Sequence, residues 1–198
     1  MHARYVVKDT FYKKAKREGY RARSAYKLEE ISRRFRLIKK GDRVLDLGAA
    51  PGSWVQVASA LVGPGGRVAG LDVLPVEPLA APNVVLAQAD IREIDAGALL
   101  EKAGVAAFDV VTCDIAPNLS GIREVDDARV VELYRAVLRV VVESLRPGGS
   151  FLIKLFVSAE FADMAKELKP LFSKVTTFKP KASRGVSAEV YVVCMGRK

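Results

Sequence analysis

The chain has 198 residues, half of them hydrophobic, and a net charge of +9, which suits one well-buried α/β domain with a polyanionic partner. Its one histidine is His2 and its two cysteines, Cys113 and Cys194, lie far apart in apolar runs, so most histidine triads, zinc sites and disulfide frameworks are excluded. No signal peptide opens the sequence and no apolar run reaches the roughly 18 residues of a membrane helix, so we expect a soluble, cytoplasmic protein that binds no membrane, and we expect a monomer.

The N-terminal fifth of the chain carries the excess positive charge. Residues 1–40 hold 14 Lys and Arg against 4 Asp and Glu, with aromatic residues interleaved, and a second basic run extends from Lys166 to Arg184. Such clustering is typical of nucleic-acid-binding surfaces, although a solvated basic face has the same composition. We predict a basic N-terminal extension over 1–40 that binds a polyanion such as a nucleic acid, with one helical turn over 1–20, and one domain over 41–198.

The elements follow from hydrophobic periodicity. Apolar residues at helical spacing predict a helix over 22–35, with Lys27 at the edge of its apolar face. Further along, we predict strands over 43–48, 67–72, 84–89, 108–114 and 149–156, and helices over 53–62, 95–103, 127–145 and 158–169. Strands over 174–178 and 188–195 have only a loop between them, so the last strand is antiparallel. This pattern predicts a Rossmann-like α/β fold with a seven-stranded, mostly parallel sheet and helices on both faces.

The stretch from Val44 to Trp54 runs from a strand through a turn of Gly, Ala and Pro into a helix. Gly48 and Gly52 would let a ligand approach bare backbone. Their spacing is neither the G-x-G-x-x-G of dinucleotide folds nor the glycine-lysine pattern of a P-loop, which disfavours NAD and ATP.

Acidic residues stand at the carboxyl ends of the first four predicted strands, Asp46, Asp72, Asp90 and Asp114, and the fifth strand carries Lys154. Ligands bind at this edge of a parallel sheet, where an acidic residue after the second strand can accept both ribose hydroxyls. Asp90 could accept from the adenine amine, and the acidic rim favours a cationic tail. An adenosine with such a tail fits best, which is S-adenosylmethionine (SAM).

The segment after the fourth strand narrows the choice of methyl acceptor. Amine methylation needs an aromatic residue there, and the segment Asp114–Asn118 has none. Methylation of a pyrimidine C5 needs an accessible cysteine, whereas both cysteines look like strand interior. A hydroxyl acceptor remains, with Lys154 as the candidate proton acceptor and Asp114 orienting its amine. The alternative is that Lys154 only extends to solvent from a strand end.

Five motifs stand in order along nearly the whole chain: Arg23–Leu28, Asp46–Trp54, Asp114–Asn118, Ile153-Lys154, and Ser183-Arg184 with Glu189–Tyr191. Together they resemble the FtsJ/RrmJ family of RNA ribose 2′-O-methyltransferases. The resemblance implies a catalytic Lys-Asp-Lys-Glu tetrad at Lys27, Asp114, Lys154 and Glu189. It also implies SAM contacts at Gly52, Trp54, Asp72, Asp90 and Asp114, and no metal. One departure is Ser53, where the family often has a second glycine.

The substrate that the resemblance implies is a uridine of large-subunit ribosomal RNA, with a tRNA anticodon loop as the alternative. Two remoter alternatives are an NAD-dependent oxidoreductase and a non-catalytic RNA-binding protein. The glycine spacing argues against the first, and the intact tetrad argues against the second.

Overall fold

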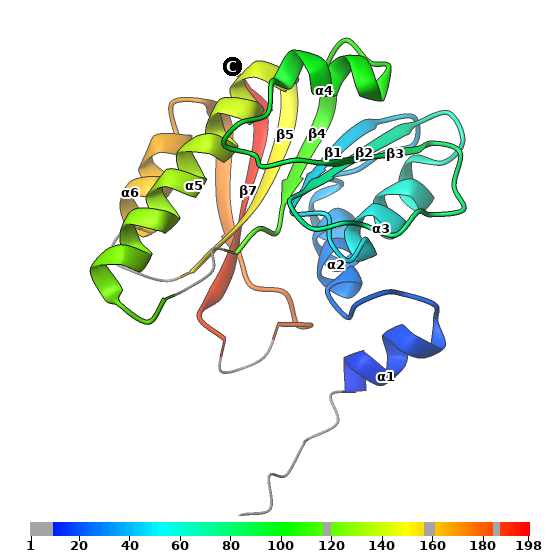
Figure 1. Cartoon of the computed structure of the whole chain (residues 1–198), viewed down its shortest axis with the longest axis horizontal. Helices are drawn as coiled ribbons and strands as arrows, with labels where there is room; N and C mark the ends of the chain where they lie inside the picture. Colours follow the sequence, from blue (N-terminus) through cyan, green and yellow to red (C-terminus); the bar gives the residue numbers. More distant parts are fainter. Residues whose placement is uncertain (1–9, 117–119, 157–160, 184–186) are drawn as a thin grey trace, which may run out of the picture.

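The computed structural model describes residues 10–116, 120–156, 161–183 and 187–198 (Figure 1). The predicted motif residues Pro117, Asn118 and Arg184 lie outside these ranges. The helices are α1 (Thr10–Arg17), α2 (Ala25–Phe35), α3 (Ser53–Val62), α4 (Ala96–Ala103), α5 (Arg123–Ser144) and α6 (Phe161–Leu168). The strands are β1 (Arg43–Leu47), β2 (Arg67–Asp72), β3 (Val84–Gln88), β4 (Phe108–Cys113), β5 (Leu145–Phe156), β6 (Phe172–Phe178) and β7 (Glu189–Arg197).

The seven strands form one sheet in the order β3-β2-β1-β4-β5-β7-β6. β7 runs antiparallel to both of its neighbours, and the other neighbouring strands are parallel. The predicted fold class is therefore confirmed, including the antiparallel last strand. The strand order reverses between β1 and β4, which is where open α/β sheets bind their ligands.

The two faces of the sheet carry separate hydrophobic cores, because alternate strand residues point to opposite faces. On one face, Phe151 and Ile153 of β5 pack in a cluster with α4, α5 and α6. On the other face, Leu152 of β5 and Tyr191 of β7 pack in a cluster with α2 and α3. Figure 1 shows α5 and α6 on the side of the sheet away from α2 and α3. Helix α2, which carries Lys27, is thus packed directly on the sheet.

The N-terminal region is more helical than predicted. Residues 10–17 form α1, which is longer than the single turn expected over 1–20. Its stability comes from tertiary contacts, since Ala15 is buried against Tyr26 and Ala182 and the Lys14 ammonium lies 4.4 Å from the Tyr26 ring centroid. A basic sequence with weak periodicity does not reveal such contacts.

The junction between α5 and β5 also differs from the prediction. Helix α5 begins four residues earlier than the predicted start at 127, and β5 begins at Leu145 instead of 149. Leu145 already pairs with Phe108, and after a register shift regular pairing resumes between Val110 and Ser150. The Pro and Gly residues between them mark that irregularity, which the sequence pattern suggested as a loop.

Both cysteines are buried free thiols, as predicted from their apolar surroundings. In the described ranges, no helix combines the length and the apolar composition that crossing a membrane requires. Those same residues include no group of three or more His, Cys, Asp and Glu that could hold a metal ion.

Candidate active site

A cavity of about 710 Å³ opens at the carboxyl ends of β1, β2, β3 and β4. Its lining comes from the turn after β1, the ends of β2 and β3, the residues after β4 and one face of α5. The lining residues are Gly48, Ala50, Leu71–Leu74, Ala89–Arg92, Asp114–Ala116, Arg129, Glu132 and Leu133. Three of the five residues expected to hold SAM, Asp72, Asp90 and Asp114, therefore line one cavity.

The glycine turn brings its backbone to this cavity. Gly48 has a φ of 81°, and a Cβ there would lie 2.6 Å from the Ile115 side chain and 2.9 Å from its backbone nitrogen. Only glycine fits so close an approach without strain. The turn is held from β2, because Asp72 accepts a hydrogen bond from the Ala50 amide at 2.9 Å with one carboxylate oxygen and from the Leu74 amide at 2.8 Å with the other.

Gly52 and Trp54 lie behind the turn and do not line the cavity. Gly52 caps α3 with a φ of 106°, and a Cβ there would lie 2.5 Å from the Arg21 guanidinium. The Trp54 indole donates to the Ser24 carbonyl at 2.9 Å, and its ring centroid lies 5.9 Å from that of Tyr191. In this arrangement Trp54 joins the turn to α2 and β7.

Asp90 is held in its charged form by Arg92. The Arg92 Nε lies 3.0 and 3.1 Å from the two carboxylate oxygens, and the Arg92 amide donates to one of them at 2.9 Å. These hydrogen bonds lower the pKa of Asp90 to about 2. From α5, Arg139 donates to the carbonyls of Ile91 and Ile94, both at 3.0 Å, which fixes the loop that presents Asp90.

Asp46 was expected at the acidic rim, and that expectation is wrong. Asp46 lies inside β1 between Gly70 and Thr112, is fully buried and does not line the cavity. One carboxylate oxygen accepts from the Thr112 hydroxyl at 2.7 Å, and the other has no hydrogen-bond partner among the described residues. Burial, followed by the charges of Asp114 and Asp72, raises the pKa of Asp46 to about 8 against the effect of the Thr112 bond.

A pH dependence of stability follows from Asp46. In the unfolded chain an aspartate has a pKa of about 3.9, so between that pH and about 8 the folded state keeps a proton that the unfolded state has released. Stability should therefore fall as the pH rises, by up to about 1.4 kcal/mol per pH unit from this group. We expect Asp46→Asn to flatten that decline in urea unfolding between pH 5 and 8. The exposed substitution Glu101→Gln should leave the slope unchanged, and an unchanged slope in Asp46→Asn would contradict the assignment.

The four residues of the expected tetrad form one connected cluster beside the cavity. Lys154 Nζ lies 3.0 Å from the Asp114 carboxylate and donates to the Asp114 carbonyl at 2.6 Å. Lys27 Nζ pairs with the Glu189 carboxylate. Tyr191 joins the two pairs, since its hydroxyl donates to Asp114 at 3.0 Å and accepts from Lys27 Nζ at 3.3 Å.

Within this cluster, burial and neighbouring charges shift the pKa values of Tyr191 and Glu189 in opposite directions. Burial, together with the charges of Asp114 and Glu189, raises the pKa of the Tyr191 hydroxyl far above its usual range, so it remains a donor. Burial alone would raise the pKa of Glu189, but the hydrogen bond and charge of Lys27 and the charge of Lys154 outweigh burial and lower it. Glu189 is therefore an anion held against a buried ammonium.

Sequence reasoning assigned no role to several residues of the site. Tyr191 was quoted only as part of a motif, and its bridging position depends on the β5–β7 register that sets it opposite Lys154. Arg92, Glu132 and Leu133 line the cavity and were not predicted. For Arg92, the available signal was its position two residues after Asp90. Nothing in the sequence of α5 marked Glu132 and Leu133 as residues that line a cavity.

The chemistry of the cavity fits the cofactor expected from the sequence. Apolar walls from Leu71, Ile91 and Ile115 can enclose an adenine base, and Asp72 and Asp90 offer carboxylate oxygens for hydroxyl and amine donors. At the other side Asp114 belongs both to the cavity lining and to the lysine cluster. A methyl donor held here would reach the cluster at Asp114.

Comparisons with known proteins point to one family. A family model described as FtsJ-like methyltransferase matches residues 20–197. The chain is 50% identical to ribosomal RNA large subunit methyltransferase E of Methanothrix thermoacetophila, covering 94% of this chain and 71% of the relative. It is 46% identical to the protein of that name from Syntrophobacter fumaroxidans, covering 96% of each. A solved ribosomal RNA methyltransferase from Plasmodium falciparum superposes with a TM-score of 0.77 at 27% identity, covering 90% of this chain and 98% of that one.

Proposed function

Because the chain belongs to the family of FtsJ-like methyltransferases and is a SAM-dependent methyltransferase, we propose that it methylates a ribose 2′-hydroxyl of large-subunit ribosomal RNA at the cluster built around Lys154. The carrying observation is that Lys154, Asp114, Tyr191, Lys27 and Glu189 form one hydrogen-bonded chain at the edge of the cavity.

The lining of the cavity supports an assignment of residues to the cofactor. Asp72 would accept from the ribose of the cofactor and Asp90 from the adenine amine, between the apolar walls. SAM supplies an electrophilic methyl group when it is bound. Gly52 and Trp54 would act from behind the turn, by keeping its backbone in place, since neither lines the cavity.

Lys154 is the proton acceptor for the 2′-hydroxyl in this proposal. Asp114 fixes its amine through two oxygens, at 3.0 and 2.6 Å. Lys27 and Glu189 lie on the other side of Tyr191 from Lys154. In this proposal they orient the acceptor ribose or the Lys154 amine for the transfer. Much of the rate enhancement would then come from alignment of the acceptor oxygen with the methyl group.

The RNA would be held by the basic residues of the region 1–40. Helix α1 presents Lys13, Lys14, Lys16 and Arg17, and α2 presents exposed Arg33 and Arg34. Phosphate contacts of this kind make binding depend strongly on salt. The names of the relatives support ribosomal RNA as the substrate.

Product analysis tests the proposal directly. The protein and methyl-labelled SAM are incubated in three separate reactions, each with one substrate: large-subunit ribosomal RNA, unmodified large-subunit particles, or tRNA. We expect label in a 2′-O-methyluridine from ribosomal RNA or the particles, identified by nucleoside mass spectrometry and by resistance of the adjacent phosphodiester to alkali. Label on a base, label in tRNA alone, or binding of NAD in place of SAM would overturn the assignment.

A further inference from the structure

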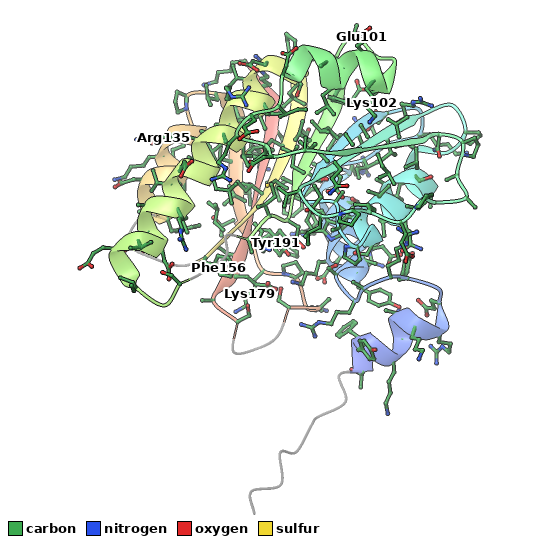
Figure 2. The ribbon with its side chains drawn as sticks, viewed as in Figure 1. Glu101, Lys102, Arg135, Phe156, Lys179 and Tyr191 are labelled. Atoms are coloured by element: carbon green, nitrogen blue, oxygen red, sulfur yellow. The ribbon has the colours of Figure 1, made fainter. Side chains whose placement is uncertain are left out.

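The β5–β7 register places Phe156 on the same face of the sheet as the proposed catalytic cluster. The register pairs Lys154 with Tyr191 and Phe156 with Glu189. Directly opposed residues of an antiparallel pair share a face, and so do residues two apart on one strand. Phe156 therefore lies on the same face as Lys154, Tyr191 and Glu189. The Lys154 Nζ atom lies 5.7 Å from the centroid of the Phe156 ring. Figure 2 shows Phe156 and Tyr191 at the same end of the sheet.

Phe156 differs from those neighbours in its exposure. The Phe156 residue is 41% exposed, whereas Tyr191 is fully buried and the side chain of Lys154 is 9% exposed. Among the described residues, Tyr12 of α1 is the other large exposed aromatic side chain. A single exposed aromatic is ordinary on a protein surface. Phe156 is unusual because its open ring adjoins the atom proposed to accept the substrate proton.

We propose that Phe156 is the platform on which the base of the acceptor nucleotide stacks. This inference rests on the proposed function, because an RNA acceptor supplies the base. In a nucleotide the base is attached to the ribose carbon next to the one that bears the 2′-hydroxyl, so a hydroxyl at Lys154 brings its own base close to the neighbouring ring. Base–aromatic stacking tolerates any base, because every base has a π-face that can lie against the ring.

Substitutions at Phe156 give the first test. We expect Phe156→Ala and Phe156→Leu to lower kcat/KM for ribosomal RNA by about tenfold to a hundredfold, the range of one base–aromatic stack, while Phe156→Tyr and Phe156→Trp stay within about threefold of wild type. The loss should lie in KM, because a stack made equally in ground and transition states leaves kcat unchanged. Leu61→Ala, at an exposed leucine of α3, is the matched control and should have no effect.

An RNA that lacks only the acceptor base separates stacking from a structural role. On that abasic RNA, the kcat/KM of wild type should fall by the same factor by which Phe156→Ala lowers kcat/KM on intact RNA. The kcat/KM of Phe156→Ala should be no lower on abasic RNA than on intact RNA. The proposal would be overturned if Phe156→Ala lowered kcat/KM relative to wild type by the same factor on abasic RNA as on intact RNA. So would full activity of Phe156→Ala on intact RNA.

A binding measurement keeps this test independent of turnover. Fluorescent oligouridylate is titrated into protein loaded with S-adenosylhomocysteine, and Phe156→Ala should weaken its binding about tenfold or more where Leu61→Ala does not. If wild type transfers no methyl group to RNA, the proposed function fails whatever Phe156 does. If wild type methylates RNA but Phe156→Ala binds oligouridylate as wild type does, the stacking proposal alone fails.

Discussion

Replacing Lys154 with alanine is expected to abolish methyl transfer while SAM still binds. General-base catalysis contributes about 10²–10⁴-fold to a rate, and we expect a loss in kcat at the upper end of this range or beyond. Binding should survive because Lys154 does not line the cavity, whereas Asp114 does and keeps its hydrogen bond from Tyr191. Isothermal titration with SAM and single-turnover methyl transfer measure the two quantities on the same sample.

Two further variants define what Lys154 does. Lys154→Arg retains the positive charge but cannot give up its proton at neutral pH, so it should be as inactive as Lys154→Ala. Lys102→Ala, at an exposed position of α4 outside both basic segments, removes a lysine that does not line the cavity and should retain activity. Near-normal turnover in Lys154→Ala would refute the assignment, and activity in Lys154→Arg alone would identify a fixed charge in place of a base.

The fold was predictable because its signals are local. Each strand of the parallel part is an apolar run bounded by Gly, Pro or Asp, and the helices between them have a clear period. The errors occurred where a distant contact decides the structure. Burial of Ala15 against Ala182 stabilises α1, and pairing of Leu145 with Phe108 starts β5 early.

The site was predictable to the extent that chain position alone determines where a residue lies. Asp72 is the last residue of β2, Asp90 and Asp114 follow the ends of β3 and β4, and all three reach the cavity. Asp46 stands one residue before the end of β1 and is enclosed by the sheet. Glu189 looked like an ordinary alternating strand residue until the family resemblance singled it out. Its contact with Lys27 joins residues that are 162 positions apart, and no local pattern encodes such a contact.

Breaking the Lys27–Glu189 pair is expected to be the most destabilising change in the site. The two side chains are 8% and 12% exposed, so removing either one leaves an opposite charge buried without its partner. Such a loss typically costs about 3–5 kcal/mol. We expect Lys27→Met to lower the free energy of unfolding by about this amount at pH 7, as measured by guanidinium denaturation.

The double variant Lys27→Met/Glu189→Gln should be more stable than Lys27→Met, because it leaves no buried ion unpaired. The exposed pair Lys166–Asp163, with an N–O distance of 2.9 Å and side chains 70% and 76% exposed, is the matched control. Lys166→Met should cost less than about 1 kcal/mol, since water replaces a lost partner at the surface. If Lys27→Met costs no more than Lys166→Met, water reaches Glu189 as well. The cluster would then lack the low-dielectric surroundings in which Lys27 can act electrostatically on Asp114 and Lys154 through Tyr191.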